Sequence, residues 1–95
     1  MFIIELTYKV ELEQIDQFLG PHIAFLNEQY KLGTVVASGR KVPRTGGIIF
    51  AKTDSKETLE EIIAKDPFYQ NDLADYTITE FAPTKTIEEL RFLME

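Results

Sequence analysis

The order in which the hydrophobic period changes along the chain is the strongest constraint on its fold. Residues 2–10 alternate between apolar and mixed side chains, which is typical of a strand with one buried face. Residues 12–30 then repeat apolar side chains every three or four positions, as an amphipathic helix does. The same two patterns recur further on and predict strands at 34–43, 46–52 and 75–81 and a helix at 54–65.

The predicted helices carry their own boundary signals. Gly20-Pro21 interrupts the first helix, so that helix is either kinked there or divided into two pieces. An Asp54-x-x-Glu57 pattern predicts the start of the second helix, and Thr86-x-x-Glu89 predicts a last short helix in the tail. One apolar stripe is expected on the first helix: Leu12, Ile15, Phe18, Leu19, His22, Leu26 and Tyr30.

The order strand, helix, strand, strand, helix, strand is that of the ferredoxin-like α+β fold. In that fold both helices cover one face of a four-stranded antiparallel sheet. The opposite face would carry apolar side chains such as Ile3 beside Glu5 and Thr7, and it is too apolar to face water. We therefore expect one domain over residues 1–95 that forms a homodimer, or a larger even assembly, with the sheets face to face.

Charge and composition disfavour several function classes. Ten Lys and Arg against sixteen Asp and Glu give a net charge of −6, so nucleic acid is not predicted as a partner. The chain has no cysteine and one histidine, which gives no disulfide and no support for a metal site. Met1 leads directly into a strand without a leader or membrane-spanning run, which predicts a cytoplasmic protein without a membrane partner. Gly46-Gly47 follows a hairpin turn rather than joining a strand to a helix, so no nucleotide cofactor is predicted.

The residues best suited to chemistry are His22 and Asp66. A lone imidazole on an apolar stripe needs a hydrogen-bond partner, and it is also the side chain best suited to proton transfer near neutral pH. Because the two helices are neighbours on one sheet face, we expect the two side chains to lie within about 2.6 to 3.2 Å of each other, or to be joined by one water.

Each of these two residues also has a purely structural interpretation. His22 can fill the core and bond a backbone carbonyl, and Asp66-Pro67 can exist only to start a helical turn, with aspartate as N-cap and proline as first residue. A carboxylate that accepts an amide with one oxygen still has the other oxygen for an imidazole, so both interpretations of Asp66 can hold.

Five cations and no acid lie between Lys31 and Lys52. Among them Arg40 and Lys41 are candidates for holding a carboxylate or phosphate of a small substrate, although solvated charges on a hairpin are the simpler explanation of the cluster. Ser38 is a candidate hydrogen-bond donor to the substrate. It is not expected to be a nucleophile, since no base neighbours it and only one histidine exists to activate it.

A larger set of residues resembles the YciI-like family of the dimeric α+β barrel superfamily: His22-x-x-Phe25-Leu26, Gly33, Ser38-Gly39, Gly46-Gly47-Ile48, Asp66-Pro67-Phe68, Tyr76 and Glu80-Phe81. The resemblance spans residues 1–83 and implies a ferredoxin-like subunit that dimerises through its sheet, with a catalytic histidine and aspartate at His22 and Asp66. The superfamily also contains isomerases, dehydrochlorinases and monooxygenases that act on small cyclic or aromatic metabolites, while most YciI-like members are of unknown activity. Many relatives have Gly-Pro where this chain has Ser38-Gly39, and the tail lies outside the shared pattern.

The sequence thus leads to two functional hypotheses. The first is a small dimeric enzyme without a cofactor that moves a proton on a small organic acid or ring metabolite, as an isomerase, lyase or hydrolase. In it His22 and Asp66 are catalytic, and Ser38, Arg40 and Phe68 bind the substrate, which is an anion if Arg40 takes part. The second is a non-catalytic module of the same fold that binds a ligand or only dimerises. A stand-alone domain with an ionisable pair exposed to solvent would favour the enzyme, and a pair sealed from solvent with no cavity beside it would favour the module.

Overall fold

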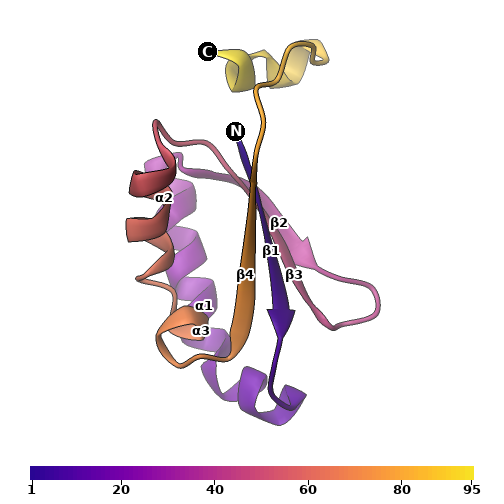
Figure 1. The fold of residues 1–95 in the computed structure, drawn as a ribbon, viewed down its shortest axis with the longest axis vertical. Helices are drawn as coiled ribbons and strands as arrows, with labels where there is room; N and C mark the ends of the chain where they lie inside the picture. The colour runs from indigo at the N-terminus through magenta and orange to yellow at the C-terminus, as the bar shows by residue number, and fades with distance from the viewer.

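A computed structural model describes residues 1–95 and contains a four-stranded sheet with helices on one face (Figure 1). The strands lie in the order β2-β3-β1-β4, and every neighbouring pair is antiparallel. This topology confirms the predicted ferredoxin-like α+β fold. The elements are β1 (Phe2–Tyr8), α1 (Leu12–Leu32), β2 (Val35–Arg40), β3 (Gly46–Ala51), α2 (Lys56–Ile63), α3 (Pro67–Gln70), β4 (Ala74–Glu80) and the 3₁₀ helix η1 (Glu88–Met94).

The core lies between the sheet and the helices, as the alternation on β1 predicts. Phe2, Ile4 and Leu6 point to the helices and are at most 2% exposed. They pack in one cluster with buried residues of β3, α1 and α2, among them Ile49 and Leu59. Burial of each such side chain contributes about 1.5 to 3 kcal/mol, so this face of β1 fixes the register of the sheet.

Helix α1 is continuous through Pro21. The proline ring has no amide hydrogen to donate to the Gln17 carbonyl, and Figure 1 shows the first turns of α1 bent away from the longer part of the helix. A kink, rather than a division into two helices, is therefore the outcome. The helix ends at Gly33, which adopts the left-handed conformation with a φ of 79°.

The buried stripe of α1 differs from the predicted one at both ends. Leu12 and Tyr30 are 42% and 40% exposed, so their assignment to the buried stripe was wrong. Gln29 is buried instead, and its side-chain oxygen accepts a hydrogen bond from the Thr34 hydroxyl at 2.6 Å. A hydrophobic pattern does not predict the burial of a polar side chain whose hydrogen-bond partner lies beyond the helix end.

The predicted cap of the second helix was wrong by one residue. Helix α2 starts at Lys56, and its N-cap is Ser55, whose hydroxyl accepts a hydrogen bond from the Thr58 amide at 3.1 Å. Serine and aspartate are about equally good N-caps, so residue type alone does not decide between the adjacent Asp54 and Ser55.

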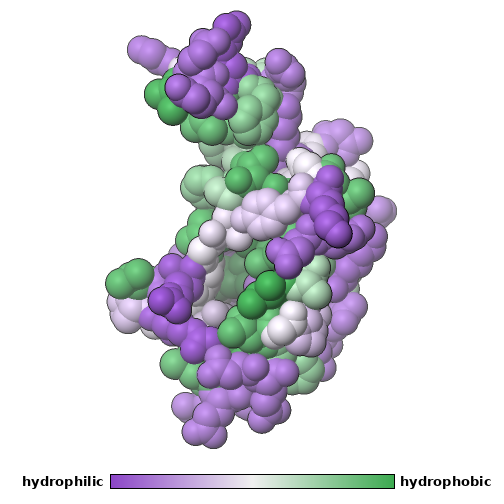
Figure 2. Space-filling view, turned by 180° about the vertical axis from the view of Figure 1, so that it is seen from behind, coloured by the Kyte–Doolittle hydropathy of each residue, from purple (hydrophilic) through white to green (hydrophobic).

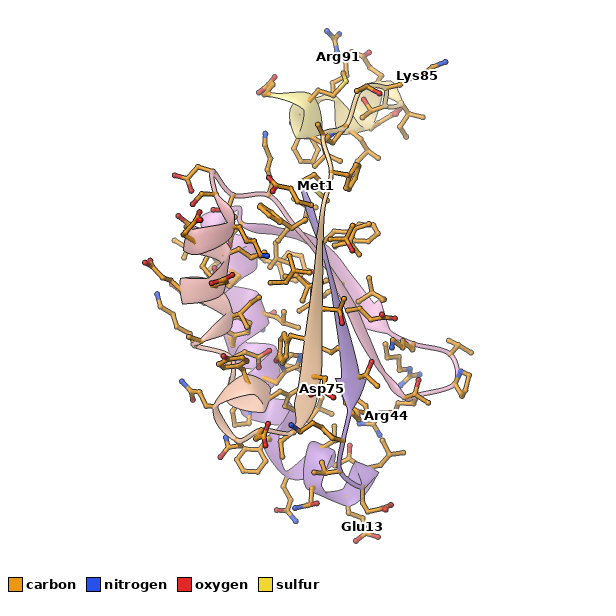
Figure 3. All side chains as sticks on the ribbon, viewed as in Figure 1. Met1, Glu13, Arg44, Asp75, Lys85 and Arg91 are labelled. Atoms are coloured by element: carbon orange, nitrogen blue, oxygen red, sulfur yellow. The ribbon has the colours of Figure 1, made fainter.

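The tail also departs from its prediction. It forms a 3₁₀ helix over Glu88–Met94, and the residue before it, Ile87, gives no side-chain cap, so the Thr86-x-x-Glu89 cap was wrong. No residue of η1 is buried, and Figure 1 shows η1 beyond the end of the sheet. Figure 3 places Lys85 and Arg91 of the tail at the opposite end of the molecule from Glu13.

The second face of the sheet is uncovered and apolar in part. Residues of β1, β2 and β3, including Ile3, Ala37 and Phe50, line a groove of about 410 Å³ together with the tail residues Leu90 and Phe92. Figure 2 shows hydrophobic residues around a hollow below the C-terminal segment. No helix in the structure is both long enough and apolar enough to cross a bilayer.

Gly46 of β3 lies against the backbone of Leu6 in β1, and it cannot take a side chain. A Cβ at this position would lie 1.8 Å from the Leu6 carbonyl oxygen, whereas a Cβ at Gly20 meets nothing within 4 Å. Gly46→Ala is therefore expected to lower the free energy of unfolding by about 3 kcal/mol, because backbone must shift. Gly20→Ala, in α1, should raise it by about 0.5 to 1 kcal/mol. Urea unfolding measures both, and equal effects would contradict the close approach.

Candidate functional site

Asp66 is held at the centre of the site by the turn between α2 and α3. Pro67 is the first residue of α3, and an oxygen of Asp66, Oδ1, accepts a hydrogen bond from the Phe68 amide at 3.0 Å. The sequence-based interpretation of Asp66 as an N-cap is therefore confirmed. The Asp66 side chain is 1% exposed, so its remaining acceptor positions must be satisfied inside the protein.

His22 supplies one of those partners. Its Nδ1 lies 2.7 Å from Oδ1 of Asp66, which confirms the predicted contact between residues 44 positions apart. Because a carboxylate only accepts hydrogen bonds, this contact places a hydrogen on Nδ1 and leaves Nε2 of the neutral ring as an acceptor. The expected division of the two oxygens was wrong, since Oδ1 accepts from both the imidazole and the Phe68 amide.

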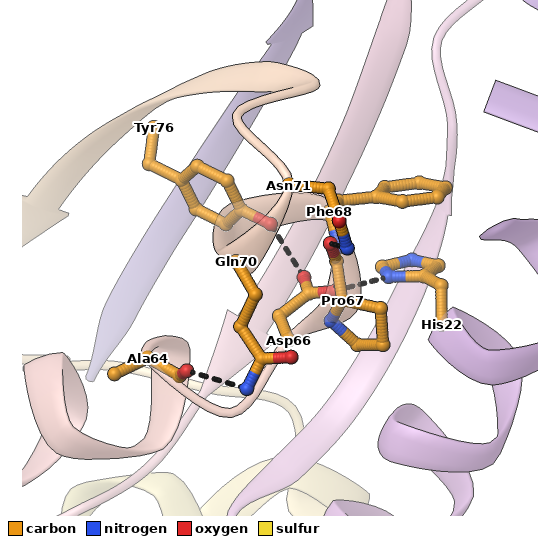
Figure 4. Close-up of polar contacts among 8 residues, drawn as sticks. All are labelled: His22, Ala64, Asp66, Pro67, Phe68, Gln70, Asn71 and Tyr76. Carbon is orange, nitrogen blue, oxygen red and sulfur yellow. Dashed lines mark hydrogen bonds and ion pairs between the residues drawn. The ribbon is translucent and has the colours of Figure 1, made fainter. Parts of the chain in front are cut away.

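The second oxygen of Asp66 is occupied by a residue that sequence reasoning missed. The Tyr76 hydroxyl donates a hydrogen bond to Oδ2 at 2.5 Å, and Figure 4 shows the tyrosine and the histidine reaching Asp66 from opposite sides. Burial, and then the charge of Asp66, raises the pKa of Tyr76 well above its usual value, so the hydroxyl stays protonated. The alternation of β4 carried the signal, because it places Tyr76 on the helix-covered face.

The imidazole is also held by an aromatic ring. Phe68 stacks on His22 with ring centroids 3.9 Å apart and an angle of 3° between the planes. Tyr8 in turn contacts Phe68 edge to face at 6.1 Å. With its plane fixed by Phe68 and its Nδ1 fixed by Asp66, the ring has one orientation.

A cavity of about 160 Å³ opens beside this ring. Four of the predicted site residues line it, namely His22, Ser38, Arg40 and Phe68, whereas Asp66 lies behind the imidazole and does not. Most of the other lining is apolar, from residues such as Leu6 and Leu26. The arrangement can accept a small and largely apolar molecule against the one nitrogen of His22 that Asp66 leaves free.

The cations of the hairpin divide into paired and unpaired groups. Lys41 lies 3.0 Å from Glu5, and Arg44 lies 2.5 Å from Asp16, so acids from other elements neutralise both. Arg40 makes no ion pair and lines the cavity. Solvated or paired charge explains most of the cluster, and Arg40 is the member whose position fits anion binding.

Other polar groups add little to the site. Ser38 shares a hydrogen bond of 2.6 Å with the Tyr30 hydroxyl, which gives the cavity rim a hydroxyl pair and no nucleophile–base arrangement. No three side chains of the types His, Cys, Asp and Glu come together as metal ligands.

A comparison with the models of known families finds a match. The model of the YCII-related domain matches residues 1–82, which includes every site residue described above. The chain belongs to the YCII-related domain family. The tail from residue 83 onward, which contains η1, lies outside the matched part. A search of the curated proteins found no match.

The solved structures extend the comparison. One similar structure is 5-chloro-2-hydroxyhydroquinone dehydrochlorinase (TftG) from Burkholderia phenoliruptrix AC1100, in complex with 2,5-dihydroxybenzoquinone. It has a TM-score of 0.73 and 15% sequence identity, and the match covers 84% of this chain and 91% of that chain. At this identity the likeness establishes a shared fold for this YCII-related domain.

Proposed function

We propose that this YCII-related domain is an enzyme that transfers a proton on a small acidic or ring-shaped metabolite, with His22 as the acid–base residue. The observation that carries the proposal is the position of His22 between a buried carboxylate and a cavity. Asp66 holds Nδ1 at 2.7 Å, and the ring lines the cavity with Nε2 unused. A general base needs this combination of a fixed ring and a free nitrogen within reach of the substrate.

In the proposed step, Nε2 accepts a proton from a C–H or O–H group of the bound substrate. The ring becomes an imidazolium, and the negative charge of Asp66 beside Nδ1 stabilises it. The imidazolium then returns the proton, either to another atom of the same substrate or to a departing group. The first outcome is an isomerisation and the second an elimination, while a water activated by Nε2 would give hydrolysis.

The cavity supports a small and acidic substrate. Its volume of about 160 Å³ matches a single ring or a short organic acid, and Arg40 and Ser38 provide polar contacts in an apolar lining. The similar dehydrochlorinase structure holds 2,5-dihydroxybenzoquinone, an acidic ring compound. In our proposal Arg40 binds an oxygen anion of the substrate, and Phe68 contacts its apolar part.

Deuterium exchange tests the proposed chemistry on candidate compounds before the natural substrate is identified. The protein would be incubated in D₂O with a panel of small keto acids and hydroxylated aromatic acids, and loss of C–H signals would be followed by proton NMR. We expect at least one compound to exchange faster than in the protein-free sample. Binding without any exchange would favour the alternative, a ligand-binding module of the same fold.

Arg40 is expected to strengthen the binding of anions. With 2,5-dihydroxybenzoquinone as the probe, Arg40→Ala should weaken binding about tenfold, as for loss of a hydrogen bond to a charged group. Added salt should weaken wild-type binding more than that of the variant. Lys31→Ala is the matched control, since Lys31 is exposed and lies outside the cavity. Calorimetry gives both constants, and equal affinities for Arg40→Ala and wild type would remove Arg40 from the site.

We further propose that two copies associate through the open face of the sheet. Phe50 is 39% exposed there, beside the partly exposed Ile3, and an apolar sheet face needs a cover. Sedimentation is expected to give a dimer at micromolar concentration, and Phe50→Lys is expected to give a monomer. Asn27→Lys, which adds the same charge on the exposed side of α1, should leave the dimer intact. A wild-type monomer would rule out this interface.

A cytoplasmic location stays a prediction.

A further inference from the structure

We infer that Tyr76 is a positioning residue for His22, acting through Asp66. This inference rests on the proposed function, since it concerns how the same imidazole is held for proton transfer. It assigns a role to a tyrosine hydroxyl that lies outside the cavity and cannot touch a substrate bound there.

The geometry forms an unbroken chain from β4 to α1. The Tyr76 hydroxyl donates to Oδ2 of Asp66 at 2.5 Å, and Oδ1 accepts from His22 Nδ1 at 2.7 Å (Figure 4). The Phe68 amide donates to Oδ1 at 3.0 Å. Three donors from three different elements therefore converge on one carboxylate that is almost completely buried.

These contacts have different effects on the carboxylate. The amide and the imidazole both bind Oδ1 and leave Oδ2 without a partner. Tyr76 is the one partner of Oδ2, and with both oxygens bound the plane of the carboxylate is fixed. A fixed plane directs the acceptor orbital of Oδ1 at Nδ1 and thereby keeps the hydrogen of the neutral ring on Nδ1.

The tyrosine is suited to this role because it is a permanent donor. Its hydroxyl keeps its proton throughout the neutral range, since burial and the adjacent carboxylate both disfavour the phenolate. Its ring is fixed by an edge-to-face contact with Tyr69 at 5.4 Å. Without the hydroxyl, Oδ2 would lack a partner in a buried site, and the carboxylate would rotate to share its oxygens among the remaining donors.

The experiment uses the fact that His22 is the one histidine of the chain. Protein labelled with ¹⁵N-histidine gives a single imidazole spectrum, which reports directly which ring nitrogen carries the hydrogen. In wild type we expect the neutral ring to carry it on Nδ1, in slow exchange with water. In Tyr76→Phe we expect Nδ1–H exchange to become about tenfold faster, the change that loss of a hydrogen bond to a charged group produces, with a measurable Nε2–H population.

Tyr69→Phe is the control, because it removes the hydroxyl of the neighbouring exposed tyrosine without touching Asp66. Its spectrum should match that of wild type. If Tyr76→Phe does not fold, wild-type protein with its four tyrosines replaced by 3-fluorotyrosine gives a second measurement. The more acidic phenol should shift the Nδ1–H resonance, and no shift would overturn the inference.

The outcomes separate this inference from the proposed function. An unchanged imidazole spectrum in folded Tyr76→Phe would overturn the positioning role and leave the acid–base role of His22 intact. A changed spectrum would support the positioning role even if the deuterium-exchange panel shows no activity.

Discussion

Replacing Asp66 with alanine is expected to lower the free energy of unfolding by about 3 to 5 kcal/mol, a large part of the stability of a small domain. The substitution leaves three donors without their acceptor: the buried His22 ring and Phe68 amide, and the partly buried Tyr76 hydroxyl. Each unsatisfied buried donor costs about 1 to 3 kcal/mol, and the N-cap of α3 is lost as well.

Urea unfolding of wild type and Asp66→Ala measures this effect. Asp75→Ala is the matched control, because Asp75 is exposed and its one ion pair, with Lys9 at 3.5 Å, lies at the surface. Such a pair contributes less than about 1 kcal/mol. A similar small loss for both variants would mean that the Asp66 network adds little to stability.

Replacing His22 with asparagine is expected to slow the deuterium exchange of any active compound by about 10² to 10⁴, the range that general acid–base catalysis contributes. The asparagine amide nitrogen can take the place of Nδ1 and donate to Asp66, so the fold should be kept. No group then replaces Nε2 in the cavity. This variant therefore separates the chemical role of the ring from its structural role.

The measurement is the exchange rate in D₂O, with unfolding in urea as a check on the fold. Lys31→Ala, which leaves the cavity unchanged, should exchange at the wild-type rate. Unchanged exchange in His22→Asn would assign the activity to another group. It would also leave His22 as a histidine that only satisfies Asp66 in the core.

Much of this architecture follows from local patterns. The alternation of β1 predicted which of its side chains are buried, and the periodicity of the other segments predicted the element order and so the sheet. The contact between His22 and Asp66 was also predictable, because the topology makes α1 and the end of α2 neighbours and each residue needs a buried partner. These predictions are correct because they depend on the hydrophobic periodicity of each segment and on the order of the elements along the chain.

The wrong predictions concern interactions that the hydrophobic periodicity of the sequence does not encode. Gln29 is buried because Thr34 satisfies it, and a hydrophobic pattern assigns glutamine to the surface. Tyr76 was not among the predicted site residues, because the alternation of β4 gives the face on which it lies but does not show that Oδ2 of Asp66 lies within reach. The tail was expected to be a capped helix, but it forms the 3₁₀ helix η1, which has no side-chain cap and buries no residue.

Because Oδ1 of Asp66 accepts two hydrogen bonds, the backbone amide at the start of α3 reports on the protonation of His22. The imidazole and the Phe68 amide share this one oxygen, at 2.7 and 3.0 Å. When the ring gains a proton, the oxygen's electron density is drawn towards the stronger donor, and the Phe68 amide bond to it weakens. The backbone amide resonance of Phe68 should therefore shift when His22 gains a proton and when a ligand binds beside it in the cavity. The imidazole itself then needs no label.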